Sequence, residues 1–448
     1  MNPWLVRHFS YPLYERLLGR RTFHLLNELE GSQWLGPDLL RSLQATKLRR
    51  LLREVSTGWP VYREYAETDL GDDLPTLLRR LPLSDKGSIR KSERDRHGGR
   101  RIRGVRRMST GGSTGEPLTF HVDRTREAYD KAARMRSYRW FGVQPGDREV
   151  YIWGVPDRHR RQDRLRAIRD VFHNHLLLSA FDLSHDAMRG YLRRMETYKP
   201  ACVFGYPSSI VKLCDFAKAE GIDLRFDLLK AVFVTGEVLD DQQRGVIESY
   251  FRVPVANGYG GRDSGFCAHQ CPHGSMHVTS EHVIMEIVDQ TGAPVPSGQS
   301  GEIVITNLDN LATPFIRYRT GDIGRLRDGA CRCGRGLELM DVISGRRTDH
   351  LVSDDGTHRH ALSLIYELRD IDAIRQFQVH QARNRSVDVR VVADRTLTAT
   401  DRERVLEGVR ACVGDKLDAS LRVVDHIEAS PSGKFRHVIS EADAAPSN

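Results

Sequence analysis

Short apolar runs alternate with longer amphipathic segments through the middle of the chain, and this alternation constrains the fold more than any other feature. Three apolar runs are expected to be buried strands: 149–153, 201–204 and 230–235. Four segments with helical spacing of apolar residues are expected to be helices: 124–142, 184–198, 208–220 and 240–251. Strands that alternate with helices in this way predict a parallel sheet covered by helices.

The rest of the chain has different sequence patterns. Residues 1–80 are expected to be mostly helical, and 81–344 to form the core of the protein. Alternating strands joined by Gly/Pro turns predict a small antiparallel β subdomain at about 277–340. Residues 345–448 are expected to fold separately as a small α+β domain. The predicted class is therefore α/β: a large N-terminal domain with helix-covered sheets plus a β subdomain, and a small C-terminal α+β domain.

Composition limits the class of protein. The 448 residues are 39% hydrophobic and 29% charged, which is typical of a soluble globular protein with more than one domain. The sequence contains neither an apolar run long enough to span a membrane nor a recognisable signal peptide, so we expect a cytoplasmic protein. The net charge of +8 includes a basic stretch at 86–107. This stretch is interpreted as a solvated face rather than a nucleic-acid site, or as a source of attraction for a polyanionic small molecule.

A segment of small residues, Ser-Thr-Gly-Gly-Ser-Thr-Gly-Glu-Pro at 109–117, has three glycines and four hydroxyl side chains. Glycines let the backbone approach a ligand closely, and successive N–H groups with neighbouring hydroxyls bind anions. The segment predicts a phosphate-binding loop, although a mobile Gly/Ser loop is the alternative. The candidate phosphate ligands are Ser109, Thr110, Gly111, Gly112, Ser113, Thr114 and Gly115.

Further glycine-containing loops follow the expected strands, at Gly205, Gly236 and 258–261. Ligands of parallel α/β sheets bind beyond the carboxyl ends of the strands. We therefore expect these loops to meet the 109–117 segment around a single crevice.

Together these motifs carry a family resemblance. The glycine-rich segment is followed by Tyr259-Gly-Gly-Arg-Asp-Ser-Gly265, Arg317-Tyr-Arg-Thr-Gly-Asp322 and Pro431-Ser-Gly-Lys434, in the order and spacing of adenylate-forming ligases. From about residue 80 to 440 the chain resembles this superfamily, and its phenylacetate–CoA ligase-like, capsule-biosynthesis-type branch in particular. The resemblance implies ATP and Mg²⁺ as cofactors and a mobile C-terminal domain.

The resemblance also implies roles for single residues. Tyr259, followed by Gly260, would pack on the adenine, and Asp322 would bind the ribose hydroxyls. Asp263 stands where the family has Glu and would lie near Mg²⁺ and the α-phosphate. Lys434 would bridge the acid's carboxylate and the α-phosphate.

Two further matches are shorter. Gly236 and Glu237 correspond to a Gly-Glu loop that lines the nucleotide and acyl pockets in the family, although Glu237 could also be an ordinary carboxylate at a helix start. Arg346 belongs to a Gly-Arg pair at the hinge between domains, where it would reach the ribose. Thr348 stands where the family often has Asp, so no hinge residue is assigned.

Four cysteines form two pairs about 60 residues apart, beside several histidines. Zn²⁺ prefers tetrahedral Cys/His sites, and the resembling branch often has a Cys…His…Cys-x-Cys-Gly arrangement. The expected ligands of a structural zinc are Cys271, His277, Cys331 and Cys333. Cys267 or His273 could replace one of them, and uncoordinated thiols are the alternative.

The remaining three cysteines lie in apolar contexts and are expected in the core: Cys202, Cys214 and Cys412.

The function implied by the resemblance is activation of a small-molecule carboxylic acid by ATP to an acyl-adenylate, followed by transfer to coenzyme A. Transfer to an amine, a hydroxyl or a carrier protein is the first alternative. A non-catalytic or nucleic-acid-binding protein that uses the 86–107 stretch is the second.

Overall fold

The computed structural model describes residues 1–66, 73–96, 102, 104–110, 118–154, 169–180, 182–237, 239, 241–289, 291–344, 350–356, 358–369, 371–427 and 438–442. These residues form two compact units. The first contains the described residues of Met1–Ser109, Leu118–Trp153 and His159–Gly345. The second contains those of Arg346–Asn448, together with Thr110 and Gly154. Within the described ranges, no helix combines the length and the apolar character that a membrane crossing requires.

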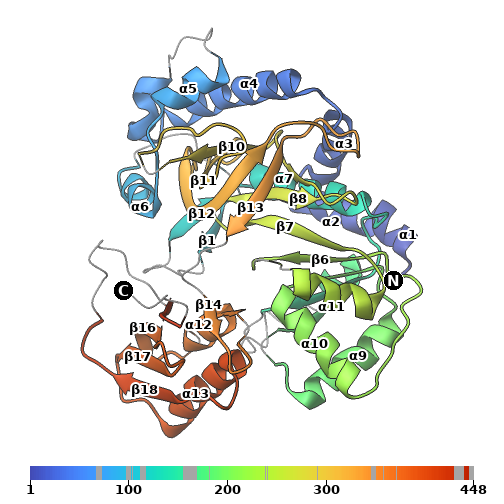
Figure 1. Cartoon of the computed structure of the whole chain (residues 1–448). Coiled ribbons are helices and arrows are strands. Elements are labelled where there is room, and N and C mark those ends of the chain that lie inside the picture. Colours follow the sequence, from blue (N-terminus) through green and yellow to red (C-terminus); the bar gives the residue numbers. More distant parts are fainter. Residues whose placement is uncertain are drawn as a thin grey trace. The chain divides into compact units, whose positions relative to one another are not determined.

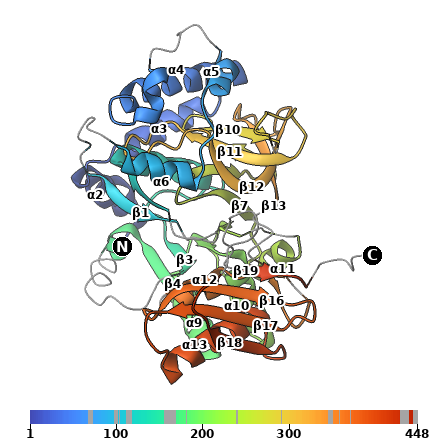
Figure 2. The same cartoon turned by 90° about the vertical axis from the view of Figure 1, so that its left-hand side faces the viewer.

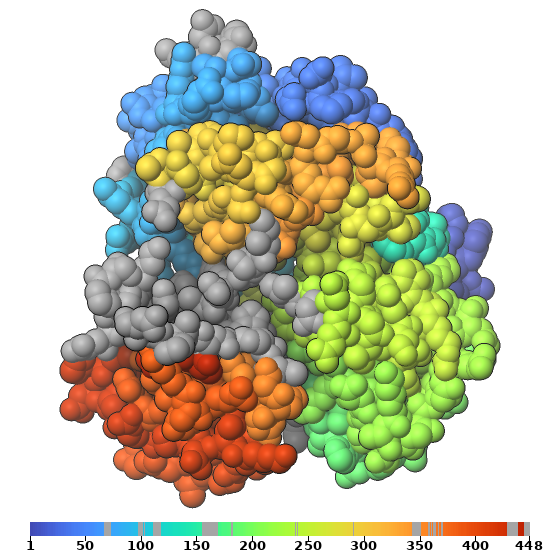
Figure 3. All heavy atoms as spheres, in the orientation of Figure 1, coloured from blue at the N-terminus to red at the C-terminus, as the bar shows by residue number. Residues whose placement is uncertain are grey.

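Helices dominate the start of the first unit (Figure 1). In order, they are α1 Pro3–Leu5, the π-helical turn η1 Val6–Ser10, α2 Tyr11–Leu17, α3 Thr22–Ser32, α4 Pro37–Val55, the 3-10 turn η2 Pro60–Tyr65, α5 Leu74–Arg80 and α6 Lys86–Arg94. Buried leucines of α4, including Leu48 and Leu51, pack in one apolar cluster with Ile284, Leu308 and Ile316 from the far half of the unit. Figure 3 shows these blue helices lying directly on the yellow and orange segments.

A mixed sheet of eleven strands forms the centre of the first unit, in the order β10-β11-β12-β13-β9-β8-β7-β6-β5-β3-β4. Its parallel half contains β3 Glu149–Trp153, β4 His175–Ser179, β5 Cys202–Gly205, β6 Ala231–Thr235 and β7 Val255–Gly261. Its antiparallel half contains β8 Gly265–Gln270, β9 Met276–Val278, β10 Val283–Val288, β11 Gly301–Asn307, β12 Tyr318–Arg327 and β13 Leu339–Ser344. The expected antiparallel strands therefore exist and continue the parallel sheet through the β7–β8 hairpin.

The four expected helices are present: α7 Arg124–Arg139 before the first parallel strand, and α9 His185–Tyr198, α10 Pro207–Ala219 and α11 Asp241–Phe251 between later ones. Side chains fix where two of them begin. Asp123 accepts a hydrogen bond from the Arg126 backbone N–H, and Ser184 accepts one from Ala187. Such N-caps satisfy the unpaired N–H groups of the first helical turn. A separate two-stranded sheet, β1 Arg106–Ser109 and β2 Thr119–Val122, leads into α7.

The second unit is an α+β fold with its own core (Figure 2). Its elements are β14 His350–Val352, β15 His358–His360, α12 Leu362–Arg369, β16 Ile374–Gln381, β17 Val387–Ala393, α13 Ala399–Val413, β18 Ala419–Val423 and β19 Val438–Ser440. Four of the strands form a sheet in the order β18-β17-β16-β19. Apolar side chains of α12 and α13, such as Leu364 and Val409, pack against Val389 of the sheet. The predicted α/β class with a small C-terminal α+β region is confirmed.

A buried ion pair joins α7 to the loop before β10. Arg136 Nη1 lies 2.6 Å from Glu281 Oε1, and the two side chains are 1% and 3% exposed. Glu281 also accepts a hydrogen bond of 2.8 Å from Ser32 Oγ on α3. A charge this deep is stable only while its partner is present.

We expect Arg136→Met to lower the free energy of unfolding by roughly 3–5 kcal/mol, because it leaves the Glu281 carboxylate buried without its cation. Arg139→Met on the same helix is the matched control. Arg139 pairs with Glu30, but the two side chains are 25% and 34% exposed, so we expect a loss of about 1 kcal/mol or less. Denaturant unfolding of both variants checks this, and equal losses would contradict it.

Candidate functional site

Two aspartates expected in the site are each held by a tyrosine from the other's segment. Tyr259 on β7 donates its hydroxyl hydrogen to Asp322 Oδ2 on β12, at 2.9 Å. Tyr318 on β12 donates to Asp263 Oδ2, in the turn after β7, at 3.0 Å. Burial, with the Asp322 carboxylate nearby, raises the pKa of Tyr259, which stays a hydrogen-bond donor. We call these two bonds the crossed tyrosine–aspartate pairs. They bring together motifs that lie about 60 residues apart in the sequence.

The Tyr259 motif is a hairpin rather than the loop that the sequence suggested. Tyr259 and Gly260 lie within β7, and β8 begins at Gly265. A Cβ at Gly260 would stand 2.1 Å from the Gly265 carbonyl oxygen, so the two strands approach more closely than a side chain allows. The glycines that looked like a ligand loop therefore permit strand pairing, and only the turn between the strands projects Asp263.

Gly236 and Glu237 follow β6, the neighbour of β7. Glu237 accepts hydrogen bonds from the Ser208 backbone N–H at 3.0 Å and from Ser208 Oγ at 2.9 Å. Burial raises the pKa of Glu237 to about 7 despite these two bonds. Gly236 has φ of +83°, and a Cβ there would lie 3.0 Å from the Tyr206 ring. Ser208 was not predicted from the sequence. It could have been found from its position in the first turn of α10, directly after β5.

Ser109 ends β1, and its carbonyl oxygen accepts a hydrogen bond of 3.3 Å from Arg262 Nη1. The start of the glycine-rich segment thus lies beside the turn that carries Asp263. Thr110 belongs to the second unit. Seven other candidates lie outside the described residues: Gly111, Gly112, Ser113, Thr114, Gly115, Arg346 and Lys434.

Side chains of α7 form hydrogen bonds to the backbone on both sides of the hairpin turn. Arg126 Nη2 donates to the Arg262 carbonyl oxygen at 2.9 Å, and Asp130 Oδ1 accepts from the Phe266 backbone N–H at 2.8 Å. Arg126 is 1% exposed, so this support is buried. Neither residue was predicted, because a charged residue on a helix has no sequence signal that separates a buried support from a solvated surface.

A network of charges continues from the half-buried Asp130 to the buried side chains of His282 and Asp309. His282 Nε2 lies 3.4 Å from Asp130 Oδ1, and its Nδ1 lies 3.0 Å from Asp309 Oδ2. Lys47 Nζ of α4 lies 2.5 Å from the same Asp309 oxygen. Burial lowers the pKa of His282, but the bonds to the two carboxylates outweigh it and raise the pKa. The protonated ring is therefore the form that the folded protein favours.

This raised pKa predicts a pH dependence of stability. A histidine whose pKa is raised by folding stabilises the protein fully below its ordinary pKa, and this contribution is lost as the pH rises through the folded-state value. We expect His282→Gln to destabilise the protein most at about pH 6 and progressively less towards about pH 9. Denaturant unfolding of both proteins across this range measures the difference, and a difference that grows with pH would contradict the assignment.

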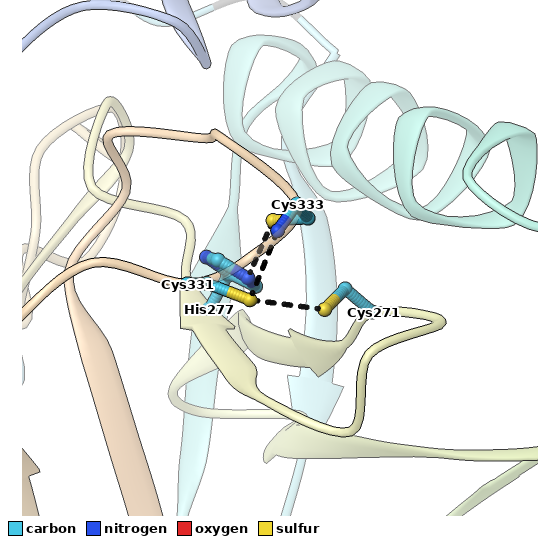
Figure 4. Close-up of side chains that lie close together, drawn as sticks. All are labelled: Cys271, His277, Cys331 and Cys333. Carbon is cyan, nitrogen blue, oxygen red and sulfur yellow. Dashed lines mark hydrogen bonds between the residues drawn. The ribbon is translucent and has the colours of Figure 1, made fainter.

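Three cysteines and a histidine meet beside β9 (Figure 4). The ligand atoms of Cys271, His277, Cys331 and Cys333 all lie within 4.8 Å of one another. Cys271 Sγ lies 3.6 Å from Cys331 Sγ, and Cys333 Sγ lies 3.3 Å from His277 Nε2. Around a tetrahedral zinc ion such pairs stand about 3.8 Å and about 3.5 Å apart. The expected set of four is therefore assembled in a geometry that fits the ion.

The protonation state of His277 also fits a metal ligand. Burial, followed by the nearby Arg335 guanidinium, lowers the pKa of His277 to about 4, so the ring is neutral at pH 7 and its Nε2 can offer a lone pair. Cys267, which could have replaced a member, lies elsewhere. Its Sγ is 3.5 Å from the Ser264 carbonyl oxygen, in an apolar cluster.

Cys202, Cys214 and Cys412 are buried, as expected for core residues.

Residues 351–441 match the family described as CapK C-terminal domain. The chain is 25% identical to protein CapK of Staphylococcus aureus over 252 residues, which cover 55% of this chain and 53% of CapK. It is 26% identical to phenylacetate-coenzyme A ligase of Pseudomonas putida, covering 80% of this chain and 82% of that protein. It is 24% identical to the Thermus thermophilus ligase of the same name, covering 89% and 96%.

Among solved structures, 2-hydroxyisobutyryl-CoA ligase, in complex with 2-HIB-AMP and CoA, shares the fold. It has a TM-score of 0.62 and 20% sequence identity, and the alignment covers 91% of this chain and 90% of that one. The resemblance to adenylate-forming ligases is therefore supported by a shared fold and by sequence similarity to the phenylacetate-coenzyme A ligases and to CapK.

Proposed function

We propose that this protein is an AMP-forming carboxylate–CoA ligase. In the first step, an oxygen of the acid attacks the α-phosphorus of ATP, an acyl-adenylate forms and pyrophosphate leaves. In the second step, the thiol of coenzyme A attacks the acyl carbon and AMP leaves. The observation that supports the proposal is the crossed tyrosine–aspartate pairs, which link the motif of Tyr259 and Asp263 to the motif of Tyr318 and Asp322. The phenylacetate-coenzyme A ligases among its relatives support it.

Each residue has a role in this scheme. Asp322 accepts hydrogen bonds from the vicinal hydroxyls of the ribose, for which a carboxylate with two acceptor oxygens is suited. Asp263 binds Mg²⁺, a hard cation that prefers carboxylate oxygens and, when bound, neutralises charge on the phosphates. Backbone N–H groups of 109–115 bind the β- and γ-phosphates. The Tyr259 ring packs on the adenine, and Gly236 and Glu237 line the nucleotide and acyl pockets.

Two candidate residues belong to the C-terminal part of the chain. Lys434 places a positive charge against the oxygens that gain charge at the α-phosphorus. Arg346 reaches the ribose from the hinge. The small domain at 345–448 rotates between the two steps, so that Lys434 is present for adenylation and absent for thiolysis.

The similarity to CapK favours a second acceptor class. Adenylation would be unchanged, and an amine, a hydroxyl or a carrier protein would attack the acyl carbon in place of coenzyme A. Product mass spectrometry after incubation with acid, ATP and each acceptor separates these outcomes.

We expect acid-dependent release of pyrophosphate from ATP, and Lys434→Ala should slow it by about 100-fold or more, because the charge on the transition state loses its partner. Asp322→Ala should weaken ATP binding. Lys416→Ala is the control, since Lys416 is an exposed lysine in the same unit and should leave the rate unchanged. If the native protein neither binds ATP nor releases pyrophosphate with a broad panel of acids, the proposed function is wrong.

We also propose that Cys271, His277, Cys331 and Cys333 bind a structural Zn²⁺. Four protein ligands leave no position for a substrate, so the ion would be structural. It would join the turn after β8 to the Cys331–Cys333 segment before β13, and so hold the antiparallel strands together at that end.

We expect about one zinc per chain by elemental analysis, and its loss in the double variant Cys331→Ser, Cys333→Ser. The melting temperature of the native protein should fall when a strong chelator removes the ion. Cys267→Ser is the matched control, because Cys267 is buried nearby but outside the cluster, and it should keep its zinc. Stoichiometric zinc in the double variant would refute the ligand set.

A further inference from the structure

A stripe of exposed apolar side chains runs along the first helices of the chain. Trp4, Phe9, Leu13 and Leu17 are 56%, 58%, 58% and 77% exposed. They stand five, four and four residues apart, and the five-residue step spans the π-helical turn η1. Because of this turn, Phe9 stays on the same side of the helix as Trp4, and the centroids of the two rings lie 5.6 Å apart. We call these four residues the N-terminal stripe.

The stripe is wider than one row of side chains. Val171 and Phe172 are also exposed, and the Phe172 backbone is held next to the helix by a hydrogen bond from Ser10 Oγ. The opposite face of the helix is buried: Val6 and Tyr11 pack into a core cluster with α3 and α7. The helix is therefore anchored in the protein, and its outer face gathers aromatic and aliphatic side chains. Contiguous exposed apolar patches of this kind mark interaction sites.

The exposed charged side chains of residues 1–21, the segment that carries the stripe, have one sign. Among residues 1–21 the one carboxylate is Glu15, which is 1% exposed and pairs with Lys131 at 2.5 Å. Arg16 and Arg21 of the same segment are exposed. The apolar face is flanked by exposed arginines, and the carboxylate of Glu15 is buried. Such a face is suited to an apolar surface that carries negative charge rather than to a neutral one.

A basic hollow lies at the start of the same helix. It has a volume of about 530 Å³, and Arg148, Arg193 and Arg194 line it together with Met1 and Tyr198. The Arg148 guanidinium is fixed by a 2.9 Å hydrogen bond to the Tyr198 carbonyl oxygen and lies over the Tyr198 ring. No carboxylate lines the hollow in the part of the chain that the structure describes. Three arginines around one hollow provide planar donors suited to a phosphate group.

We propose that the N-terminal stripe and the basic hollow together dock the protein on the surface of an anionic phospholipid membrane. The stripe enters the boundary between headgroups and acyl chains, and the hollow takes a lipid phosphate. A second copy of this chain fits less well. A two-fold contact through the stripe would place Arg16 and Arg21 near their own copies, and the segment offers no exposed carboxylate to pair with them. The inference is independent of the proposed ligase function.

Co-sedimentation with vesicles tests the proposal on the full-length protein. We expect binding to vesicles of phosphatidylcholine mixed with phosphatidylglycerol, weaker binding to phosphatidylcholine alone, and release as the salt concentration rises. The double variant Phe9→Glu, Leu13→Glu should lose binding. The double variant Arg193→Glu, Arg194→Glu should bind at least about tenfold more weakly.

Matched controls carry the same changes elsewhere. Leu39→Glu alters another apolar side chain that is 60% exposed, on α4. The double variant Arg53→Glu, Arg402→Glu reverses two exposed arginines far from the hollow in sequence. Both controls should bind as the native protein does. Circular dichroism establishes that each variant is folded.

A second measurement needs no charged variant. Brominated phosphatidylcholine in the anionic vesicles should quench part of the tryptophan fluorescence of the native protein, and Trp4→Phe should remove that part. Three outcomes overturn the proposal. They are absence of binding to anionic vesicles, binding or quenching unchanged by the stripe variants, and a concentration-dependent dimer in solution that Phe9→Glu, Leu13→Glu abolishes.

Discussion

The candidate site depends on two hydrogen bonds that cross between segments. Tyr259 holds Asp322 and Tyr318 holds Asp263, so each aspartate is positioned by a tyrosine from the segment that carries the other aspartate. A carboxylate that accepts a hydrogen bond from a buried hydroxyl loses freedom to rotate and keeps a defined direction for its remaining lone pairs. The two hydrogen bonds also connect the segment of β7 to β12, although β8, β9 and β13 separate these strands in the sheet. Neither aspartate can move without disturbing the other segment.

Buried charges beneath the hairpin explain why this arrangement holds. Arg126 and Asp130 bind the backbone on both sides of the turn, and Asp130 is linked through His282 and Asp309 to Lys47. Charges are taken out of water at a high cost in free energy, and they are tolerated here because every member faces an opposite charge or a backbone group. The N-terminal helices thereby contribute to the geometry of the site, although no nucleotide motif lies in them.

The cysteine cluster shows a different relation between sequence and structure. Residue type, the Cys-x-Cys pair and the family resemblance predicted four zinc ligands, with Cys267 or His273 as alternatives for one of them. The structure selects among the alternatives through strand register. β8 pairs with β9 and β9 with β13, and the segments at the ends of these strands bring Cys271 and His277 to Cys331 and Cys333. Cys267 lies on β8 with its thiol directed into the apolar core, which excludes it from the cluster.

Hydrophobic periodicity and turn residues in the sequence determined the order of most strands and helices and the α/β class, because these depend on local patterns. The spacing of cysteines and histidines indicated which four residues would cluster. The sequence did not reveal β4, the pairing of β7 with β8, the roles of Ser208, Arg126 and His282, or the single-sign surface of the N-terminal helix. These features arise from contacts between residues far apart in the chain. Whether a charged side chain on a helix is a buried support or a solvated group is decided by what packs against it, and packing is a property of the tertiary structure alone.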